Sequence, residues 1–533
     1  MHGQRPTIAS VGSVVAAAHP LAAQAGARLL AGGGNAFDAA VATAAALNVV
    51  EPYMSGLAGQ GLATCWAAAE GRIKVLDFVP RVPSRFPVER FKSRDDLARG
   101  PLSVGTPGNL AGWAELSRAH GRKPFADALL PAIGLARDGF PLVEFNVDEI
   151  NEHAPQLERY TAFHAEFARA YMGGADRVAL GRVLRQPDLA RTLERIAAEG
   201  PQVVYGGALG RAIVAHLETL GGCITLGDLE AFAPRWREPI SADYRGRMVH
   251  VPPPPCEGFQ FLLTLRVLER FDLARLECNG VDHLDTVYRA IRLAAGVRIA
   301  SNNPDAKTLA RLLGDDHVDA LVERVRDGQP VTGPTEQWMA PPLGGEDSGH
   351  TTSFSIADGE GNLICVTQSL GSPFGSGVVV PGTGICLNNF LYWSEVTTGS
   401  PNRTRPGAEL PMCMSPSIST LAGRPVLALG TPGSYGILQT QAQAFVQYVD
   451  FGLDLQAAIE APRARLWDGR SVHAEGRLPA STIEALRVRG HAVEAVAPWT
   501  MRVGGMQAIA IDPETGVKTG AADPRRDGYA VAL

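Results

Sequence analysis

A mixed α/β fold is predicted, because segments of helical and of strand periodicity alternate along the 533 residues of the chain. Helical patterns cover residues 20–50, most of 110–220, and 282–299. Strand patterns cover residues 73–78, 235–251 and 426–429, and the clearest is a β-hairpin over residues 351–370. The chain is long enough to bury a large core.

The first predicted elements are two helices separated by glycines. Small and apolar residues recur at helical spacing over residues 20–30, and the glycines at 32–34 end this helix. Asn35 is suited to cap the next helix, since Asp38 follows three residues later and an alanine-rich run comes after it.

Two connecting segments are predicted to be irregular. The glycine-rich stretch at residues 55–61 is expected to be a loop in which Gln60 is solvated. Residues 330–350 form a polar linker with four prolines, which excludes a long helix or a central strand there.

The predicted hairpin has a polar and an apolar face. If its turn is centred on Glu360, Ser353 lies opposite Thr367, and Thr351 lies opposite Ser369. The apolar face carries Phe354, Ile356, Ile364 and Val366, and the polar face carries Thr351, Ser353, Ser355, Thr367 and Ser369. Thr351 therefore has another hydroxyl across the ladder.

Thr351 carries the chemical hypothesis. Cleavage of the His350–Thr351 bond would give Thr351 a free α-amine beside its own hydroxyl, so that nucleophile and base sit in one residue. The alternative is an exposed hairpin whose outer face is lined by hydroxyl groups without a chemical role, which is common. The hairpin residues alone favour this alternative.

The composition excludes several classes of partner. The formal charge is −6 without acidic or basic runs, so neither nucleic acid nor a membrane is expected as a partner. No apolar stretch could span a bilayer, and the N-terminus lacks a convincing signal peptide. The seven cysteines are scattered without a CxxC pair, which argues against a zinc site or a disulfide framework. We expect a cytoplasmic protein without metal or cofactor.

Several motifs together resemble the γ-glutamyltranspeptidase family. The hairpin is similar to the start of that family's small subunit: it reads Thr351-Thr352, Asp358-Gly359-Glu360-Gly361-Asn362 and Val366-Thr367-Gln368-Ser369-Leu370. Further similar motifs are Gly33-Gly34-Asn35-Ala36-Phe37-Asp38-Ala39-Ala40, Phe374-Gly375-Ser376-Gly377, Gly384-Ile385-Cys386-Leu387-Asn388-Asn389 and Asp523-Pro524-Arg525. The resemblance covers almost the whole chain.

The resemblance implies an αββα sandwich of the N-terminal-nucleophile hydrolase type. One precursor would be cut between His350 and Thr351 into a large subunit, residues 1–350, and a small subunit, residues 351–533. The two subunits would form one structural domain, and a homodimer of the processed pair is also considered.

The resemblance also implies roles for single residues. Thr351 would be the nucleophile that cuts the precursor and later attacks an amide, and the Ser369 hydroxyl would support it. The backbone N–H groups of Gly433 and Ser434 would hold the oxyanion, which for Ser434 requires a suitable φ.

The ligands that this family uses for the glutamyl head group are replaced here. The replacing residues are Val79 for an arginine, Met412 and Cys413 for two serines, Trp393 for an acid, and Gly371 for an asparagine. Because buried charges without partners are costly, the site should reject the glutamyl α-amino-acid end and accept a less polar acyl group.

An acidic acyl group would need another cation. Arg81, two residues past Val79, is the candidate clamp, and a solvated surface arginine is an equally weighted alternative. The predicted substrate site is Arg81, Thr367, Asn389, Tyr392, Trp393, Met412 and Cys413.

Three functions stay open. The first is an amidohydrolase or acylase that removes a non-glutamyl acyl group from a small-molecule amide through an acyl-enzyme. The second is a genuine γ-glutamyl hydrolase or transferase acting on glutathione-like donors. The third is an unprocessed, silent binding protein. Intact Thr351, Ser369 and Gly433 argue against the third function, and the lost head-group ligands argue against the second.

Overall fold

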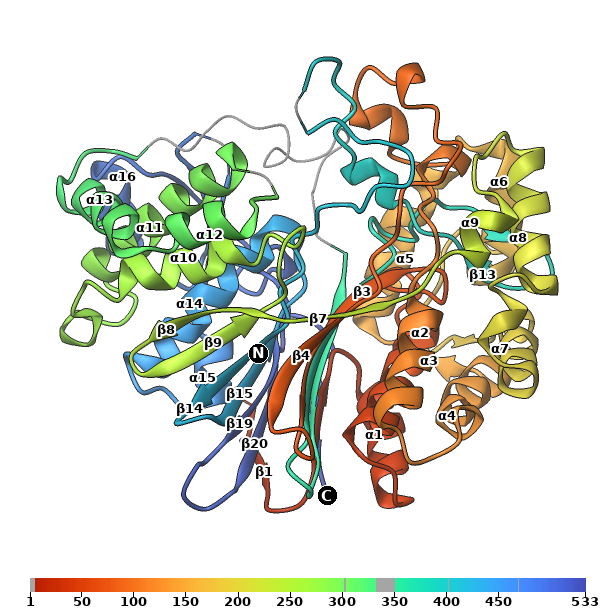
Figure 1. Ribbon diagram of the computed structural model, residues 1–533, viewed down its shortest axis with the longest axis horizontal. Helices are drawn as coiled ribbons and strands as arrows, with labels where there is room; N and C mark the ends of the chain where they lie inside the picture. Colours follow the sequence, from red (N-terminus) through yellow and green to blue (C-terminus); the bar gives the residue numbers. More distant parts are fainter. Residues whose placement is uncertain (1–4, 302, 332–349, 401, 468) are drawn as a thin grey trace.

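Two seven-stranded sheets form the centre of the molecule (Figure 1). The computed structural model describes residues 5–301, 303–331, 350–400, 402–467 and 469–533. In spatial order, the first sheet consists of β1 (Ile8–Ser10), β20 (Lys518–Ala522), β19 (Gln507–Ile511), β15 (Arg424–Gly430), β14 (Ser417–Leu421), β9 (Arg247–Val251) and β8 (Ile240–Tyr244). The second consists of β21 (Tyr529–Ala532), β2 (Val14–Ala17), β10 (Thr352–Ala357), β11 (Leu363–Ser369), β3 (Gln60–Ala67), β4 (Arg72–Asp77) and β7 (Arg235–Arg237).

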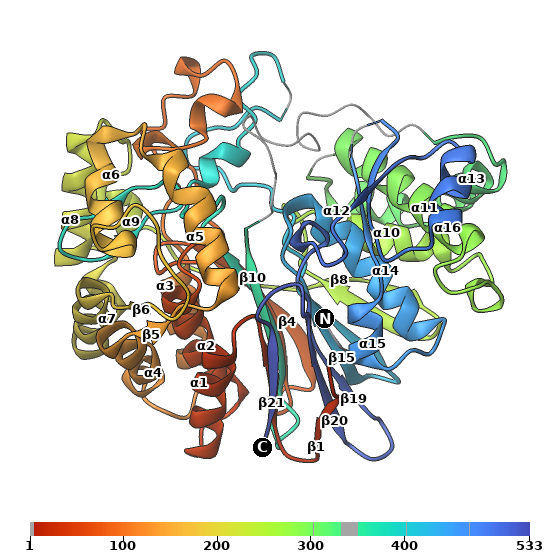
Figure 2. The same ribbon diagram turned by 180° about the vertical axis from the view of Figure 1, so that it is seen from behind.

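Helices cover the outer face of each sheet, as both views show (Figures 1 and 2). The helices on the side of the second sheet are α1 (Pro20–Ala31), α2 (Ala36–Val50), α3 (Asn109–His120), α4 (Phe125–Asp138), α5 (Glu144–Leu157), α6 (Thr161–Phe167), α7 (Pro187–Glu199), α8 (Ala208–Thr219) and α9 (Leu226–Glu230), of which α1, α2 and α3 pack on its strands. The helices on the side of the first sheet are α10 (Phe259–Leu268), α11 (Val281–Ala300), α12 (Ala306–Leu312), α13 (Asp315–Arg326), α14 (Ile437–Val449), α15 (Leu455–Glu460) and α16 (Ala480–Val488).

Small sheets complete the fold at its periphery. They pair β5 (Phe140–Pro141) with β6 (Val183–Leu184) and β12 (Val379–Val380) with β13 (Ile385–Cys386), and they join β16 (Ala464–Leu466), β17 (Ser471–Glu475) and β18 (Ala492–Val496). Among the described residues, no helix combines the length and apolar character needed to cross a membrane.

The side chains of the hairpin separate the layers. Phe354 and Val366 are fully or almost fully buried against the helices over the second sheet. Leu363 and Cys365 point the other way and pack between the two sheets. Ser355 Oγ also reaches the facing sheet, where it donates to the carbonyl oxygen of Gln507 in β19 at 3.2 Å. The predicted αββα layering is confirmed. Both faces of the hairpin are buried, so the alternative of an exposed hairpin is wrong.

The predicted helix start and the predicted turn are both confirmed. Asn35 and Asp38 form a reciprocal capping box at the start of α2. In the hairpin turn, the Asp358 carboxylate accepts hydrogen bonds from the backbone of Glu360 and Asn362, and also from Ala36 N at 2.9 Å. One carboxylate thus shapes the turn and satisfies a free N–H group at the start of a helix.

The predicted loop is confirmed for residues 55–59, but the prediction of a solvated Gln60 was wrong. Gln60 is completely buried and begins β3, because residues 60–66 pair with β11 over its whole length. Most of the predicted linker, residues 332–349, lies outside the described residues.

Candidate active site

The hairpin register brings Thr351 and Ser369 together. Ser353 pairs with Thr367 as predicted, so the next polar pair on that face is Thr351 and Ser369. Their side-chain oxygens lie 3.2 Å apart, with Thr351 donating, and Thr351 is only 6% exposed. A neighbouring hydroxyl therefore orients the hydroxyl of Thr351.

Ser369 also contacts the peptide bond that would be cut. Its Oγ donates to the carbonyl oxygen of His350 at 2.8 Å and accepts from Gly371 N at 2.9 Å. With the bond from Thr351, the Ser369 hydroxyl accepts two hydrogen bonds and donates one. This arrangement links the proposed nucleophile to the carbonyl that precedes it.

Gln60 lies next to this pair. It pairs with Ser369 across β3 and β11, so their side chains share the face that carries Thr351. Gln60 Nε2 donates to Met412 Sδ at 2.9 Å, and Gln60 Oε1 is buried without a hydrogen-bond partner among the described residues. Gln60, beside the candidate nucleophile, thus contacts Met412, one of the residues that replace the family's head-group ligands.

Two buried charged residues flank the start of β10, and the sequence analysis missed both. Arg526 donates to the carbonyl oxygen of Thr351 at 2.7 Å, and Glu51 accepts from Thr352 Oγ1 at 2.8 Å. Burial raises the pKa of Glu51 to about 7, although Arg526 and the bond from Thr352 act in the opposite direction. The only signal for Arg526 is its place directly after the Asp523-Pro524-Arg525 motif.

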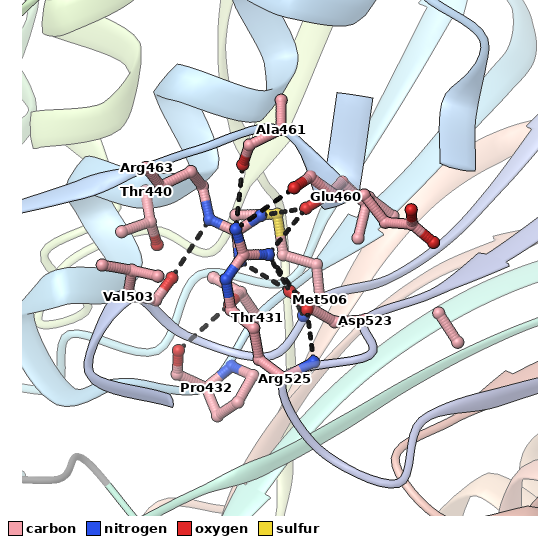
Figure 3. A network of polar contacts seen from close by, with 12 residues as sticks. Thr431, Pro432, Thr440, Glu460, Ala461, Arg463, Val503, Met506, Asp523 and Arg525 are labelled. Atoms are coloured by element: carbon pink, nitrogen blue, oxygen red, sulfur yellow. Dashed lines mark hydrogen bonds and ion pairs between the residues drawn. The ribbon is translucent and has the colours of Figure 1, made fainter. Parts of the chain in front are cut away.

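The Asp523-Pro524-Arg525 motif holds the end of the chain in place (Figure 3). Arg525 and Arg463 both bind the buried carboxylate of Asp523, and Arg463 Nη2 lies 2.5 Å from Asp523 Oδ2. Burial alone would raise the pKa of Asp523, but the two guanidinium groups hold it at about 2. The network thereby fixes the segment from which Arg526 reaches Thr351.

The predicted oxyanion loop follows β15. Gly430, at the end of that strand, packs against Ser353, two residues from Thr351. Gly433 has φ +131°, and Ser434 adopts the left-handed region with φ +53°. The backbone conformation that Ser434 must adopt is thus present, while its role in binding an oxyanion stays a prediction.

The His350 side chain lies in a buried polar cluster with Glu149 and His153 of α5. Its Nε2 is 2.8 Å from Glu149 Oε2, and its ring meets that of His153 edge-on with centroids 4.8 Å apart. Burial raises the pKa of Glu149 to about 7 and lowers that of His153 to about 3. All three residues are buried: Glu149 and His153 are each 3% exposed, and His350 is 1% exposed.

These three residues are also the candidate metal ligands among the described residues. Their ligand atoms all lie within 4.8 Å of one another. The 2.8 Å contact is the length of a direct hydrogen bond, however, and cleavage after His350 would release that ligand. We therefore interpret the cluster as a hydrogen-bonded group.

Gly371 and Trp393 lie together beside Ser369. A Cβ atom on Gly371 would collide with Asn389 Oδ1 and would lie 3.1 Å from Trp393 Cζ3, and Gly371 has φ +105°. Asn389 Oδ1 accepts from Ser372 N at 2.8 Å, and its Nδ2 donates to Ala98 O at 2.8 Å. Asn389 therefore links loops, and the packing excludes a side chain at the position where the family has its asparagine.

The other predicted substrate residues lie in different surroundings. Tyr392 is 5% exposed, packs edge-on against Trp393 and carries the Arg94 guanidinium over its ring. Cys413 is buried in the core between the first sheet and its helices. Thr367 is completely buried between the sheets.

Arg81, the candidate clamp, lies beside Glu409. Its backbone forms an isolated β-bridge with Glu409. With Val79, Arg81 lines a shallow surface pocket that also contains Arg235 and the carboxylates of Asp77 and Glu409. Arg81 and Val79 do share one pocket, so a role as carboxylate clamp stays open.

Comparisons with known proteins agree with this geometry. The family model described as gamma-glutamyltranspeptidase matches residues 22–533. The chain is 36% identical to an acylase ACY 1 proenzyme of Pseudomonas sp. (strain SE83), covering 99% of this chain and 95% of that protein. It is 30% identical to a glutathione hydrolase proenzyme of Bacillus subtilis (strain 168), covering 98% and 91%. The crystal structure of cephalosporin acylase from Bacillus halodurans superposes with a TM-score of 0.93 at 30% identity, covering 100% and 98%.

The layered fold and its likeness to the cephalosporin acylase structure define an N-terminal-nucleophile hydrolase. The chain belongs to the γ-glutamyltranspeptidase family. Within that family it is an autoprocessing amidohydrolase similar to the acylases.

Proposed function

We propose that this protein cuts itself between His350 and Thr351 and then uses Thr351 to remove a non-glutamyl acyl group from a small amide. One observation carries the proposal: Ser369 Oγ lies 3.2 Å from Thr351 Oγ1 and 2.8 Å from the His350 carbonyl oxygen. The Ser369 hydroxyl thus contacts both the proposed nucleophile and the carbonyl group that it would attack first, in a buried site.

Both reactions have the same steps. Thr351 Oγ attacks the carbonyl carbon, the C–N bond breaks, and the hydroxyl proton passes to the leaving nitrogen, which leaves an ester on Thr351. Water then cleaves the ester, returning a proton to Oγ and releasing a carboxylic acid. In the second reaction the free α-amine of Thr351 serves as the base. Gly433 and Ser434 supply the N–H groups that stabilise the negative oxygen.

The surroundings of Thr351 support a substrate without the glutamyl head group. Trp393 and Met412 are apolar where the family has an acid and a serine, and Gly371 has no room for a side chain. The similarity to acylase proenzymes also supports a non-glutamyl acyl group. The similarity to a glutathione hydrolase proenzyme makes a γ-glutamyl substrate the alternative. A homodimer and a cytoplasmic location stay predictions.

A comparison of wild-type protein with Thr351→Ala tests the proposal. Wild type should give two fragments on a denaturing gel, and the smaller one should begin with Thr351 by mass spectrometry. Thr351→Ala should give one full-length band and no amidase activity. A mutant that still splits at this bond, or an uncut and active wild type, would exclude Thr351 as the nucleophile.

A further inference from the structure

Cleavage after His350 would vacate a buried polar pocket beside the nucleophile. The His350 side chain is 1% exposed, and its Nε2 lies 2.8 Å from Glu149 Oε2. When residue 350 becomes a chain end and leaves, its contacts with Glu149 and His153 are lost. The space of one imidazole side chain then opens next to Thr351.

The walls of this pocket do not depend on His350. Glu149 and His153 lie on α5, which is tied to the rest of the fold from several sides. Asn146 Nδ2 donates to Val50 O at 3.0 Å and to Tyr53 Oη at 2.8 Å. Asn151 exchanges two hydrogen bonds of 2.9 Å with the backbone of Val178. The buried carboxyl and the second imidazole therefore keep their positions after maturation.

Self-cleavage also identifies the first acyl group that the site accepts. The ester formed on Thr351 carries the acyl group of His350, and an external amide would form the same kind of ester on the same oxygen. The imidazole of His350 is thus the side chain of the first acyl group, and it sits on Glu149 while its carbonyl contacts Ser369.

The geometry points to a subsite, formed by Glu149 and His153, for acyl groups that carry an imidazole-like nitrogen heterocycle. The inference rests on the proposed self-cleavage. Loss of the 2.8 Å contact is unfavourable for the buried Glu149 carboxyl even with Arg526 and His153 nearby, so a ligand that restores the contact gains affinity. His153 Nε2, 3.6 Å from the same carboxylate, also has no hydrogen-bond partner among the described residues.

An imidazole suits this pocket better than a simple ammonium group does. The ring can donate a hydrogen bond to an ionised Glu149 or accept one from a protonated Glu149. An ammonium group can only donate, and a second carboxylate would meet the Glu149 carboxyl directly. A planar ring also reproduces the edge-on contact with His153.

Two matched amides test the subsite on the mature enzyme. Imidazolepropionyl p-nitroanilide carries the His350 acyl group without its amine, and phenylpropionyl p-nitroanilide has a ring of similar size without nitrogen. We expect kcat/KM to be about tenfold higher for the imidazole compound, as one hydrogen bond to a charged group provides. Glu149→Gln should reduce this ratio, while Asp148→Asn, an exposed carboxyl on the same helix, should keep it.

A binding measurement needs no variant of the pocket. Imidazolepropionate should bind mature wild type in calorimetry and should not bind Thr351→Ala precursor, where His350 still fills the site. Equal binding to both forms, or a higher kcat/KM for the phenyl compound, would overturn the subsite while leaving the proposed amidase in place. Absence of self-cleavage would overturn both, and the gel separates the two cases.

Discussion

Ser369 donates a hydrogen bond of 2.8 Å to the carbonyl oxygen of His350, the residue before the proposed nucleophile. The Ser369 hydroxyl oxygen also accepts a hydrogen bond from the hydroxyl of Thr351. Ser369 thus polarises the bond to be cut and orients the group that attacks it. Neither role involves the covalent ester itself.

The first prediction concerns Ser369→Ala. It should slow both self-cleavage and amide turnover about 10- to 100-fold, as expected for the loss of one hydrogen bond in the reacting group. A time course on gels and steady-state kinetics measure the two effects. Ser481→Ala, an exposed hydroxyl on α16, is the control. Wild-type rates in Ser369→Ala would remove Ser369 from the site.

The second prediction concerns Ser434→Gly. Because Ser434 has φ +53°, glycine should relieve strain and raise the free energy of unfolding by up to about 1 kcal/mol, while turnover is kept. Ser434→Val should lose activity, since a β-branched residue resists this conformation. Urea unfolding and kinetics measure both. An inactive Ser434→Gly would mean that the serine side chain, rather than its backbone N–H, acts.

The third prediction concerns Gly371→Ala. The new Cβ would collide with Asn389 Oδ1 at a backbone of φ +105°, so we expect a loss of about 2–3 kcal/mol in unfolding free energy and poor maturation. Gly399→Ala is the control, because Gly399 has φ +86° and open space around it. It should lose only about 1 kcal/mol from its left-handed conformation. Equal losses of unfolding free energy in Gly371→Ala and Gly399→Ala would show that the contact with Asn389 adds no destabilisation.

The fourth prediction concerns the donor. γ-Glutamyl-p-nitroanilide should have a kcat/KM at least ~10²-fold below that of a matched acyl-anilide without the α-amine, because the head group finds no charged partners. Kinetics on glutamyl, glutaryl, oxamyl and phenylacetyl amides decide this. If an acidic group is preferred, Arg81→Ala should raise KM for it selectively. A preference for the γ-glutamyl compound would restore an ordinary transpeptidase.

The fifth prediction concerns pH and Glu51. The folded state raises the pKa of Glu51 from its ordinary value of 4.5 to about 7. Stability from this group is therefore fully present below pH 4.5 and is lost as the pH rises through about 7. Glu51→Gln cannot ionise, so it avoids this loss of folding stability, and its amide oxygen can still accept the hydrogen bond from Thr352. Relative to its parent, it should gain on the order of 1–3 kcal/mol between pH 5 and 8.

This comparison is best made on single-chain Thr351→Ala protein by urea unfolding at several pH values. A parallel variant, Glu70→Gln, is the control, because Lys74 lowers the pKa of that carboxyl. A difference between Glu51→Gln and its parent that does not change with pH would contradict the raised pKa.

Local rules were sufficient for part of the site. The hairpin register follows from the turn and the alternation of side chains, so the Thr351–Ser369 pair could be predicted. The capping box at Asn35 depends on residues three positions apart and was predicted for the same reason.

The remaining site residues depend on contacts distant in sequence. Gln60 is buried only because β3 pairs with β11, which no local pattern reveals. Arg526 reaches Thr351 across 175 positions, and Glu149 reaches His350 across 201. Each of these side chains looks like an ordinary surface residue until the layers are assembled.

The order of strands in the sheets has a consequence for the cut molecule. In the second sheet, β2 from the large subunit lies between β21 and β10 from the small subunit, and the first sheet also contains strands of both. A single cut before Thr351 leaves every one of these pairings in place. Refolding changes its reaction order, however: the intact chain folds at a rate independent of concentration, whereas two separated fragments must first collide. The lifetime of the mature protein would therefore depend on a slow rate of unfolding, because refolding requires two fragments to meet. Dilution would lower the yield of refolded protein.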